Sequence, residues 1–262
     1  MFERLVLEYS NSENYLDIFL VSLFFALLSI FLVDNLVTFQ VGRTDLGGII
    51  AVLLTSLSVS YPFVTYMIRQ EDRELLQRWE EKKLVRRHAR QLELYMSFFF
   101  GVTFAFALSV FYLPDSFYSV QLQVLQSIRG PTGNMVLNGL LMQIVSNNMW
   151  VFAVTFVLAF FVSSGIIFIL AWNASVLGVL IGSLADHALQ VPFVTLFYLP
   201  HGLLEVGGYV LAGIAGSLMS YAVERPVQGK EKDLHLRVLK DVAVMVGVGA
   251  VLIVAAGLIE VI

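Results

Sequence analysis

The chain is a succession of long apolar runs separated by short polar segments. A transmembrane helix needs about 20 predominantly apolar residues to cross the hydrocarbon core of a bilayer, and several runs reach that length. Full spans are predicted over residues 18–39, 46–68, 94–113, 149–171, 203–223 and 242–262. The pattern therefore predicts an all-α, polytopic integral membrane protein, with residues 1–262 forming a single transmembrane domain.

Residues 174–199 are apolar at both ends, but Asp186, His187, Gln190 and Pro192 interrupt them. At about 1.5 Å per residue this segment would reach about 39 Å. A helix broken in this region could therefore still cross, as the discontinuous helices of transporters do. We expect about seven crossings, one of them discontinuous. The alternative is six spans plus a re-entrant segment.

Three polar segments separate the spans. Residues 69–93 carry charges of both signs around spaced apolar residues, which predicts an amphipathic helical loop. Residues 114–146 are predicted to form a loop with a short apolar stretch that cannot cross alone. Residues 224–241 are predicted to be a charged linker.

Composition supports the membrane assignment and narrows the function. The chain is 58% hydrophobic and only 14% charged, which is unusual for a soluble globular domain. With 16 Lys and Arg against 20 Asp and Glu, it lacks the basic excess that binding to nucleic-acid phosphates requires. It contains no cysteine, and no nucleotide-binding motif is recognisable, so we expect no cofactor.

The Lys and Arg residues predict the orientation, because they are enriched in cytoplasmic loops. With the N-terminus in the cytoplasm, only Arg43 and Arg129 of the 16 Lys and Arg residues fall outside. The N-terminus and residues 69–93 and 224–241 are therefore predicted to be cytoplasmic. Residues 114–146 and the C-terminus are predicted to lie outside the cell membrane.

Polar groups inside the spans are the candidates for function, because burying them in a bilayer is costly. His201 and Glu205 lie four residues apart in a helix predicted to begin near Pro200, so they share a face and can hydrogen-bond. Such a pair can handle protons or bind a metal, or it can simply orient one helix against another. The full candidate cluster is Asn147, Asn148, Asn173, Asp186, His201, Glu205 and Glu260.

Two histidines, His187 and His201, are candidate metal ligands. A zinc site made from His187, His201 and Glu205 is geometrically feasible, since imidazole and carboxylate are both zinc ligands. The order His-Gly-Leu-Leu-Glu lacks the paired histidines of metalloproteases. No catalytic residue can be named from the sequence.

Small residues recur at four-residue spacing, as in Gly178 with Gly182 and Gly213 with Ser217. This spacing lets helix backbones approach closely. It predicts tight packing either within one protomer or between protomers of a homo-oligomer.

Motifs in the C-terminal half resemble the stage II sporulation protein M family of multi-pass membrane proteins. They are Pro200-His201-Gly202-Leu203-Leu204-Glu205, the small-residue stretch 207–216, Asn173 after a span, and Gly257-Leu258-Ile259-Glu260 in the last span. The resemblance runs from Asn147 onward. It implies a polytopic protein without established enzymatic activity. The members of the family that take part in sporulation act with partner proteins in cell-envelope remodelling.

Three functions are compatible with the sequence. The favoured one is a non-enzymatic scaffold or assembly factor in a membrane complex. The alternatives are a transporter or channel with a polar site around His201 and Glu205, and an intramembrane metal-dependent hydrolase. The expected partners are the lipid bilayer, further copies of this chain, and membrane or envelope proteins, with no nucleic acid.

Overall fold

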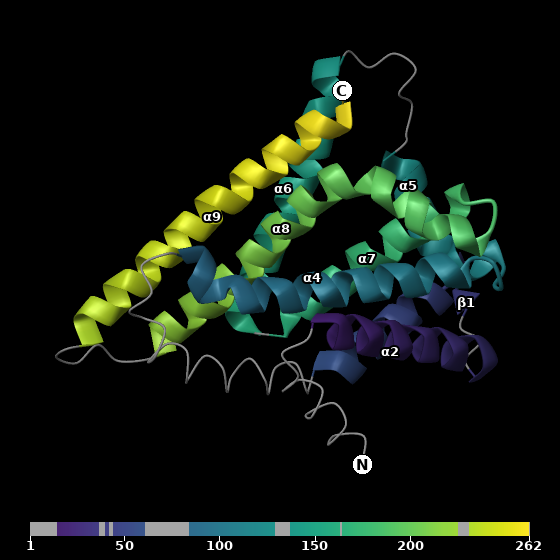
Figure 1. Ribbon diagram of the computed structural model, residues 1–262, viewed down its shortest axis with the longest axis horizontal. Helices are drawn as coiled ribbons and strands as arrows, with labels where there is room; N and C mark the ends of the chain where they lie inside the picture. Colours follow the sequence, from purple (N-terminus) through teal and green to yellow (C-terminus); the bar gives the residue numbers. More distant parts are fainter. Residues whose placement is uncertain are drawn as a thin grey trace. The chain divides into compact units, whose positions relative to one another are not determined.

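The computed structural model describes residues 15–36, 40–41, 44–60, 84–128, 137–162, 164–224 and 231–261, and long α-helices dominate them (Figure 1). The α-helices are α2 (Tyr15–Leu36), α4 (Leu84–Ser109), α5 (Ser119–Ile128), α6 (Leu137–Phe161), α7 (Gly165–Leu184), α8 (Val191–Glu224) and α9 (Glu231–Val261). The other elements are two short 3₁₀ helices, η2 (Asp115–Tyr118) and η4 (Ala188–Gln190), and a hairpin of β1 (Gln40–Val41) and β2 (Thr44–Asp45).

The described residues contain six helices that are long and apolar enough to cross a membrane. A seventh, shorter apolar helix spans Gly47–Ser60. The predicted all-α, polytopic fold is therefore confirmed. Residues 174–199, which were expected to form one discontinuous crossing, hold the second part of α7, the 3₁₀ helix η4 and the start of α8.

The chain divides into two compact units. The first comprises Met1–Trp79, Glu93–Pro131 and Leu170–Tyr198, and the second comprises Glu80–Leu92, Thr132–Ile169 and Leu199–Ile262. Helices α4, α7 and α8 each contribute residues to both units. The predicted single transmembrane domain stays a prediction.

Small residues allow close packing of α4 against α7 in the first unit. A Cβ atom on Gly178 would lie 2.5 Å from the Thr103 carbonyl oxygen, and one on Gly182 would lie 2.6 Å from the Ala107 carbonyl oxygen. Ala107 also belongs to the apolar core of this unit, together with Ile181. The Gly178/Gly182 spacing thus serves packing within one protomer.

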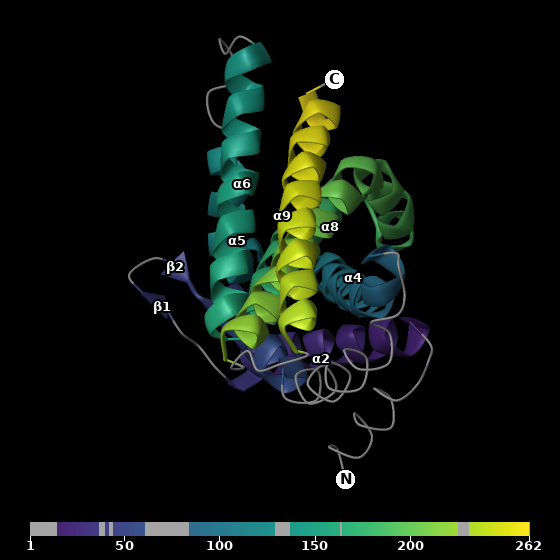
Figure 2. The same cartoon turned by 90° about the vertical axis from the view of Figure 1, so that its left-hand side faces the viewer.

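Helices α6 and α9 pack side by side in the second unit (Figure 2). Helix α8 contacts α9 where a Cβ on Gly208 would lie 3.1 Å from the Gly249 carbonyl oxygen. It contacts α6 where a Cβ on Gly216 would collide with the Phe156 carbonyl oxygen. Glycines thus allow the three helices to approach one another closely.

The helix boundaries differ from the predicted spans at several places, and the first lies within residues 149–171. Residues 149–171 were expected to form one span, but α6 ends at Phe161 and α7 begins at Gly165. The Gly165 amide hydrogen-bonds to the Val162 carbonyl at 2.7 Å, which closes a tight turn. Hydropathy cannot reveal this turn, because apolar residues flank it on both sides.

The break predicted between Asp186 and Pro192 falls between α7 and α8. The Gln190 side chain stabilises it by accepting a 2.9 Å hydrogen bond from the Asp186 amide. The prediction of a helix start near Pro200 is wrong, because α8 runs through Pro200 without interruption. A proline removes one backbone donor, and transmembrane helices tolerate that loss. Residues 203–223 are therefore the second part of α8.

The predicted polar segments are partly outside the described residues. Of residues 69–93, only 84–93 are described, and they begin α4. Residues 114–146 are more helical than expected, since they hold η2 and α5, and their apolar stretch enters α6 from Leu137. Of residues 224–241, the described part ends α8 and begins α9. The cytoplasmic and outer assignments stay predictions.

Candidate functional site

A side-chain hydrogen bond between two apolar helices forms the centre of the candidate site. Asn148 of α6 donates through Nδ2 to Oε1 of Glu205 on α8. Asn148 is buried and Glu205 is half-buried. The exposed neighbour Asn147 donates to Asn148 Oδ1 at 3.3 Å. Because a carboxylate accepts several hydrogen bonds, the pair satisfies the buried amide without adding another charge.

Glu260 and Tyr209 of the second unit interact with Glu205, and His201 interacts with Glu260. Its carboxylate lies close enough to that of Glu260 on α9 for their charges to interact. His201, one turn before Glu205 on α8, interacts electrostatically with Glu260. Tyr209, one turn after Glu205, is buried beside both carboxylates. The arrangement can hold a proton or orient helices.

The remaining predicted residues belong to the first unit. Asn173 is half-buried and lies inside α7, so its predicted place after a span is wrong. Asp186 and His187 are exposed in the break between α7 and α8. The Asp186 carboxylate accepts from Gln190 Nε2 at 3.4 Å. Asp186 therefore serves the local turn.

The described residues do not form a recognisable metal centre. Among them, no three His, Asp or Glu side chains are grouped so that they could hold a metal ion. His201 and Glu205 belong to the second unit, and His187 belongs to the first. The described residues therefore do not support the zinc site.

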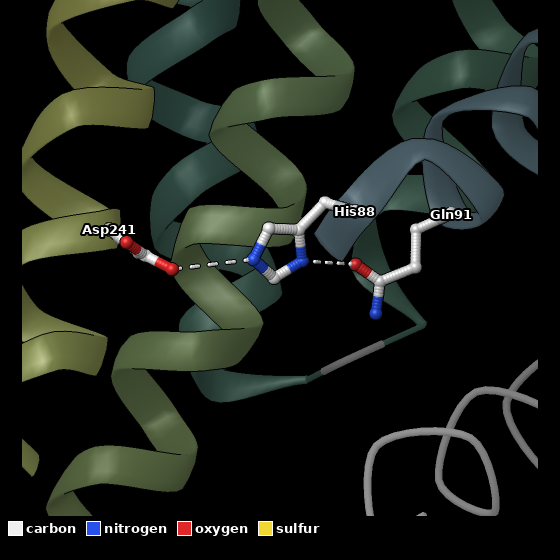
Figure 3. Close-up of polar contacts among 3 residues, drawn as sticks. All are labelled: His88, Gln91 and Asp241. Carbon is white, nitrogen blue, oxygen red and sulfur yellow. Dashed lines mark hydrogen bonds and ion pairs between the residues drawn. The ribbon is translucent and has the colours of Figure 1, made fainter. Parts of the chain in front are cut away.

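Sequence reasoning missed a buried histidine that links the start of α4 to the first half of α9. Figure 3 shows the His88 ring lying between Gln91 and Asp241. Its Nδ1 is 3.0 Å from Gln91 Oε1, and its Nε2 is 3.7 Å from Asp241 Oδ2. His88, Gln91 and Asp241 are all buried. We call these three residues the histidine cluster.

The chemistry of the histidine cluster follows from its two acceptors. With the Gln91 amide as assigned, both ring nitrogens of His88 face oxygen atoms. Nδ1 lies within hydrogen-bonding distance of Gln91, whereas Nε2 has no hydrogen-bond partner among the described residues and lies at ion-pair distance from Asp241. The sequence signal is the three-residue spacing of His88 and Gln91 on one helix face. It was overlooked because both residues lie in a segment rich in charges.

A second polar contact that the sequence did not reveal lies in the first unit. The Tyr118 hydroxyl donates a 2.7 Å hydrogen bond to Ser109 Oγ. Burial raises the pKa of the Tyr118 phenol above its ordinary value of 10.0, the Ser109 hydrogen bond opposes this shift, and the negative charge of Asp34 adds to it. Tyr118 is therefore neutral and anchors η2 to the end of α4.

Comparison with known proteins finds one family and one relative. Residues 94–262 match the model of the family described as "Stage II sporulation protein M". An uncharacterised protein of Methanocaldococcus jannaschii is 32% identical over 110 residues, which are 42% of this chain and 58% of the relative. The chain thus spans little more than half the length of that curated relative. No solved structure is detectably similar.

Proposed function

Because this chain belongs to the stage II sporulation protein M family, we propose that it acts as a non-enzymatic scaffold or assembly factor in a membrane complex. A scaffold holds its helices in fixed positions and leaves surfaces to which partner proteins bind. It needs a firmly packed helical interior, and it needs no group that reacts with a substrate.

The hydrogen bond between Asn148 and Glu205 is the observation that carries this proposal. A carboxylate that served transport or catalysis would have to be reached by an ion, water or a substrate. Glu205 instead accepts from the buried amide of a neighbouring helix. Interhelical hydrogen bonds of this kind fix helix positions, so the bond supports a structural role for both residues.

The histidine cluster supports the same role at the other end of the helices. His88 of α4 interacts with Asp241 of α9, and the two residues lie within the charged segments 69–93 and 224–241. Those segments carry most of the Lys and Arg residues and are predicted to be cytoplasmic. Helices that are fixed at this point would hold both segments in place for a membrane or envelope protein to bind.

The test is chemical crosslinking in native membranes, followed by purification in mild detergent. We expect a specific partner protein with the wild-type chain. We expect the same partner with Glu205→Gln, because glutamine keeps an acceptor oxygen for Asn148. The paired variant Arg86→Ser with Arg87→Ser should recover much less of this partner, because it removes two charges from segment 69–93. Absence of any partner from the wild-type chain would contradict the proposal.

Transport is the second candidate, and the grouping of His201, Glu205 and Glu260 within apolar helices favours it. Such groups are common on proton and ion pathways. The test is ion or proton flux into vesicles that contain the purified chain. A transporter should lose flux on Glu205→Gln and on His201→Ala. Protein-free vesicles are the control, and flux no higher than theirs would remove this candidate.

A further inference from the structure

Helix α6 has two opposite faces, and only one of them is covered. The buried face carries Ile144, Asn148, Phe152, Thr155 and Ala159, and it meets α8 and α9. The other face is exposed along the whole helix. Only 17% of the apolar window of α6 is buried, compared with 61% for α4 and for α7.

The exposed face of α6 includes polar residues inside the candidate span, where lipid would offer them no hydrogen bonds. It carries Gln143, Ser146, Asn147 and Trp150, and Trp150 is 70% exposed. The span Gly139–Phe161 is centred on Trp150, so Gln143 lies about 11 Å from the centre at about 1.5 Å per residue. This is inside a hydrocarbon core that reaches about 15 Å to either side.

Polar side chains in this position need a protein partner. Gln143 and Ser146 form no side-chain hydrogen bond with any described residue. An amide facing hydrocarbon without a partner is costly. Tryptophan is also usually found at the membrane interface rather than at the centre of a span. The composition of this face therefore indicates that it is covered in the membrane.

The spacing of the exposed face is that of a helix which pairs along its length. Successive exposed residues are four and three positions apart, which is the heptad pattern of left-handed helix pairs. Gly139, Ser146 and Ala153 lie seven positions apart and are small, which would let the backbones of two such helices approach each other. The residues of this seam are Gly139, Gln143, Ser146, Trp150, Ala153 and Val157, all of them exposed.

We propose that this seam of α6 binds the same seam on a second copy of the chain, with the two helices parallel. Two copies with the same orientation in a membrane are related by a two-fold axis along the membrane normal. Each residue then meets its own counterpart at the same depth. Gln143, Ser146 and Asn147 suit this arrangement, because amides and hydroxyls both donate and accept.

The charge of α6 fits the same partner. Residues 137–161 contain no Asp, Glu, Lys or Arg, so a homotypic pair brings no like charges together. The small positions Gly139, Ser146 and Ala153 would meet one another, with Gln143, Trp150 and Val157 filling the intervening layers. The seam is therefore complementary to itself. This pairing is independent of the function proposed above, since a scaffold and a transporter can both be dimers.

Cysteine crosslinking tests the pairing directly, because the chain has no cysteine of its own. The full-length Ser146→Cys variant in native membranes should form a disulfide-linked species of twice the monomer mass under mild oxidation. The matched control is Val251→Cys, near the middle of α9 and 66% exposed. We expect several-fold more linked dimer with Ser146→Cys than with this control.

A scan along α6 distinguishes a specific seam from random collision. Linked dimer should be high at Gln143, Trp150 and Ala153 and low at Ile144 and Phe152. A flat profile, or dimer at Ser146 no higher than at Val251, would overturn the proposal. A linked species of any other mass would show that a different protein covers α6, and would overturn it as well.

A second measurement uses the chain without cysteines. Single-molecule photobleaching in lipid should show two copies per particle for the wild type. It should show mostly one copy for the paired variant Gln143→Leu with Asn147→Leu, whose changes lie on the exposed face and leave Asn148 intact. One copy per particle for the wild type, or a fully dimeric variant, would overturn the proposal.

Discussion

Single polar residues decide how the apolar helices of the second unit are held. Asn148 is buried in α6 and donates to Glu205, while His88 at the start of α4 faces Asp241 of α9. An unsatisfied polar group in such surroundings is more costly than the bond itself is favourable. Removing one partner alone should therefore destabilise the protein more than replacing both.

We expect Asn148→Ala to lower the free energy of unfolding by about 1–3 kcal/mol, because it leaves Glu205 half-buried without its amide donor. The measurement is thermal or denaturant unfolding in detergent. Asn147→Ala, at the exposed neighbouring position, is the matched control and should cost clearly less. The paired change Asn148→Leu with Glu205→Leu should recover part of the loss. Equal effects of the two alanine variants would contradict this assignment.

Tyr118 should make the protein sensitive to alkaline pH. Its folded pKa is raised above the ordinary value, so the folded state favours the neutral phenol. The resulting stability is fully present below about pH 10 and decreases as the pH rises further, because the unfolded state loses the proton first.

Tyr118→Phe should reduce this alkaline loss. It should also cost about 1 kcal/mol at neutral pH, through the lost hydrogen bond to Ser109. Unfolding curves at neutral and alkaline pH check both effects, and an unchanged alkaline loss in Tyr118→Phe would refute the first.

At the scale of helices, glycine decides which faces approach each other. The four-residue spacing of Gly178 and Gly182 was visible in the sequence, but the sequence left open whether it serves one protomer or two. The structure uses both residues between α7 and α4. By contrast, a Cβ added to Gly247 on α9 would have no heavy atom within 4 Å. Gly247 therefore has no role in helix packing, although α9 is also an apolar helix.

We expect Gly178→Ala to destabilise the protein by about 1–3 kcal/mol, because the new methyl group would meet the Thr103 carbonyl, which cannot rotate away. Gly247→Ala is the control. It should be neutral, or stabilising by up to about 1 kcal/mol through helix propensity. Unfolding of both variants in the same detergent decides the matter. Equal stability of the two would mean that α4 and α7 are not in close contact.

The sequence predicted the apolar helices well and their ends less well. Hydropathy locates α2, α4, α6, α8 and α9 because a bilayer demands about 20 apolar residues. It merged α6 with part of α7, because the turn at Val162–Gly165 is set by backbone hydrogen bonds within an apolar run. It divided α8 at Pro200, where tertiary surroundings override the usual effect of proline.

The sequence predicted individual residues of the candidate site but not the contacts between them. Buried polar groups are rare in apolar runs, so Asn148, His201, Glu205 and Glu260 were recognisable one by one. The pairing of Asn148 with Glu205 was not, because the two residues lie 57 positions apart on different helices. His88 and Asp241 were not predicted, because both lie among charged residues in the sequence and do not stand out from them.

At the scale of the whole molecule, the number of crossings depends on one short helix. Helices α4, α6, α7 and α8 are four potential crossings between the charged segments 69–83 and 225–230, which agrees with both being cytoplasmic. If both segments are cytoplasmic, as predicted, a crossing by α9 predicts an outer C-terminus. Helix Gly47–Ser60 is only about 21 Å long at about 1.5 Å per residue, and whether it crosses decides the side of the N-terminus. The Lys and Arg residues do not discriminate, since either arrangement leaves all but two of the 16 inside.

Labelling with a membrane-impermeant maleimide should settle this orientation. We expect Ile262→Cys to react in intact cells and Ser10→Cys to react only after permeabilisation, as seven crossings require. The chain without cysteine is the control for background. Reaction of both variants in intact cells would mean that residues 47–60 do not cross and that the membrane is spanned six times.

The bond between Asn148 and Glu205 also bears on how the protein is made. Synthesis proceeds from the N-terminus, so α6 leaves the ribosome well before α8. At about 5–20 residues per second, the 57 positions between the partners take several seconds. During that interval the amide of Asn148 has to remain in the translocation machinery, in water, or beside another chain. A nascent chain stalled before α8 would therefore expose an unpaired amide to lipid, which gives membrane quality control a feature by which to recognise it.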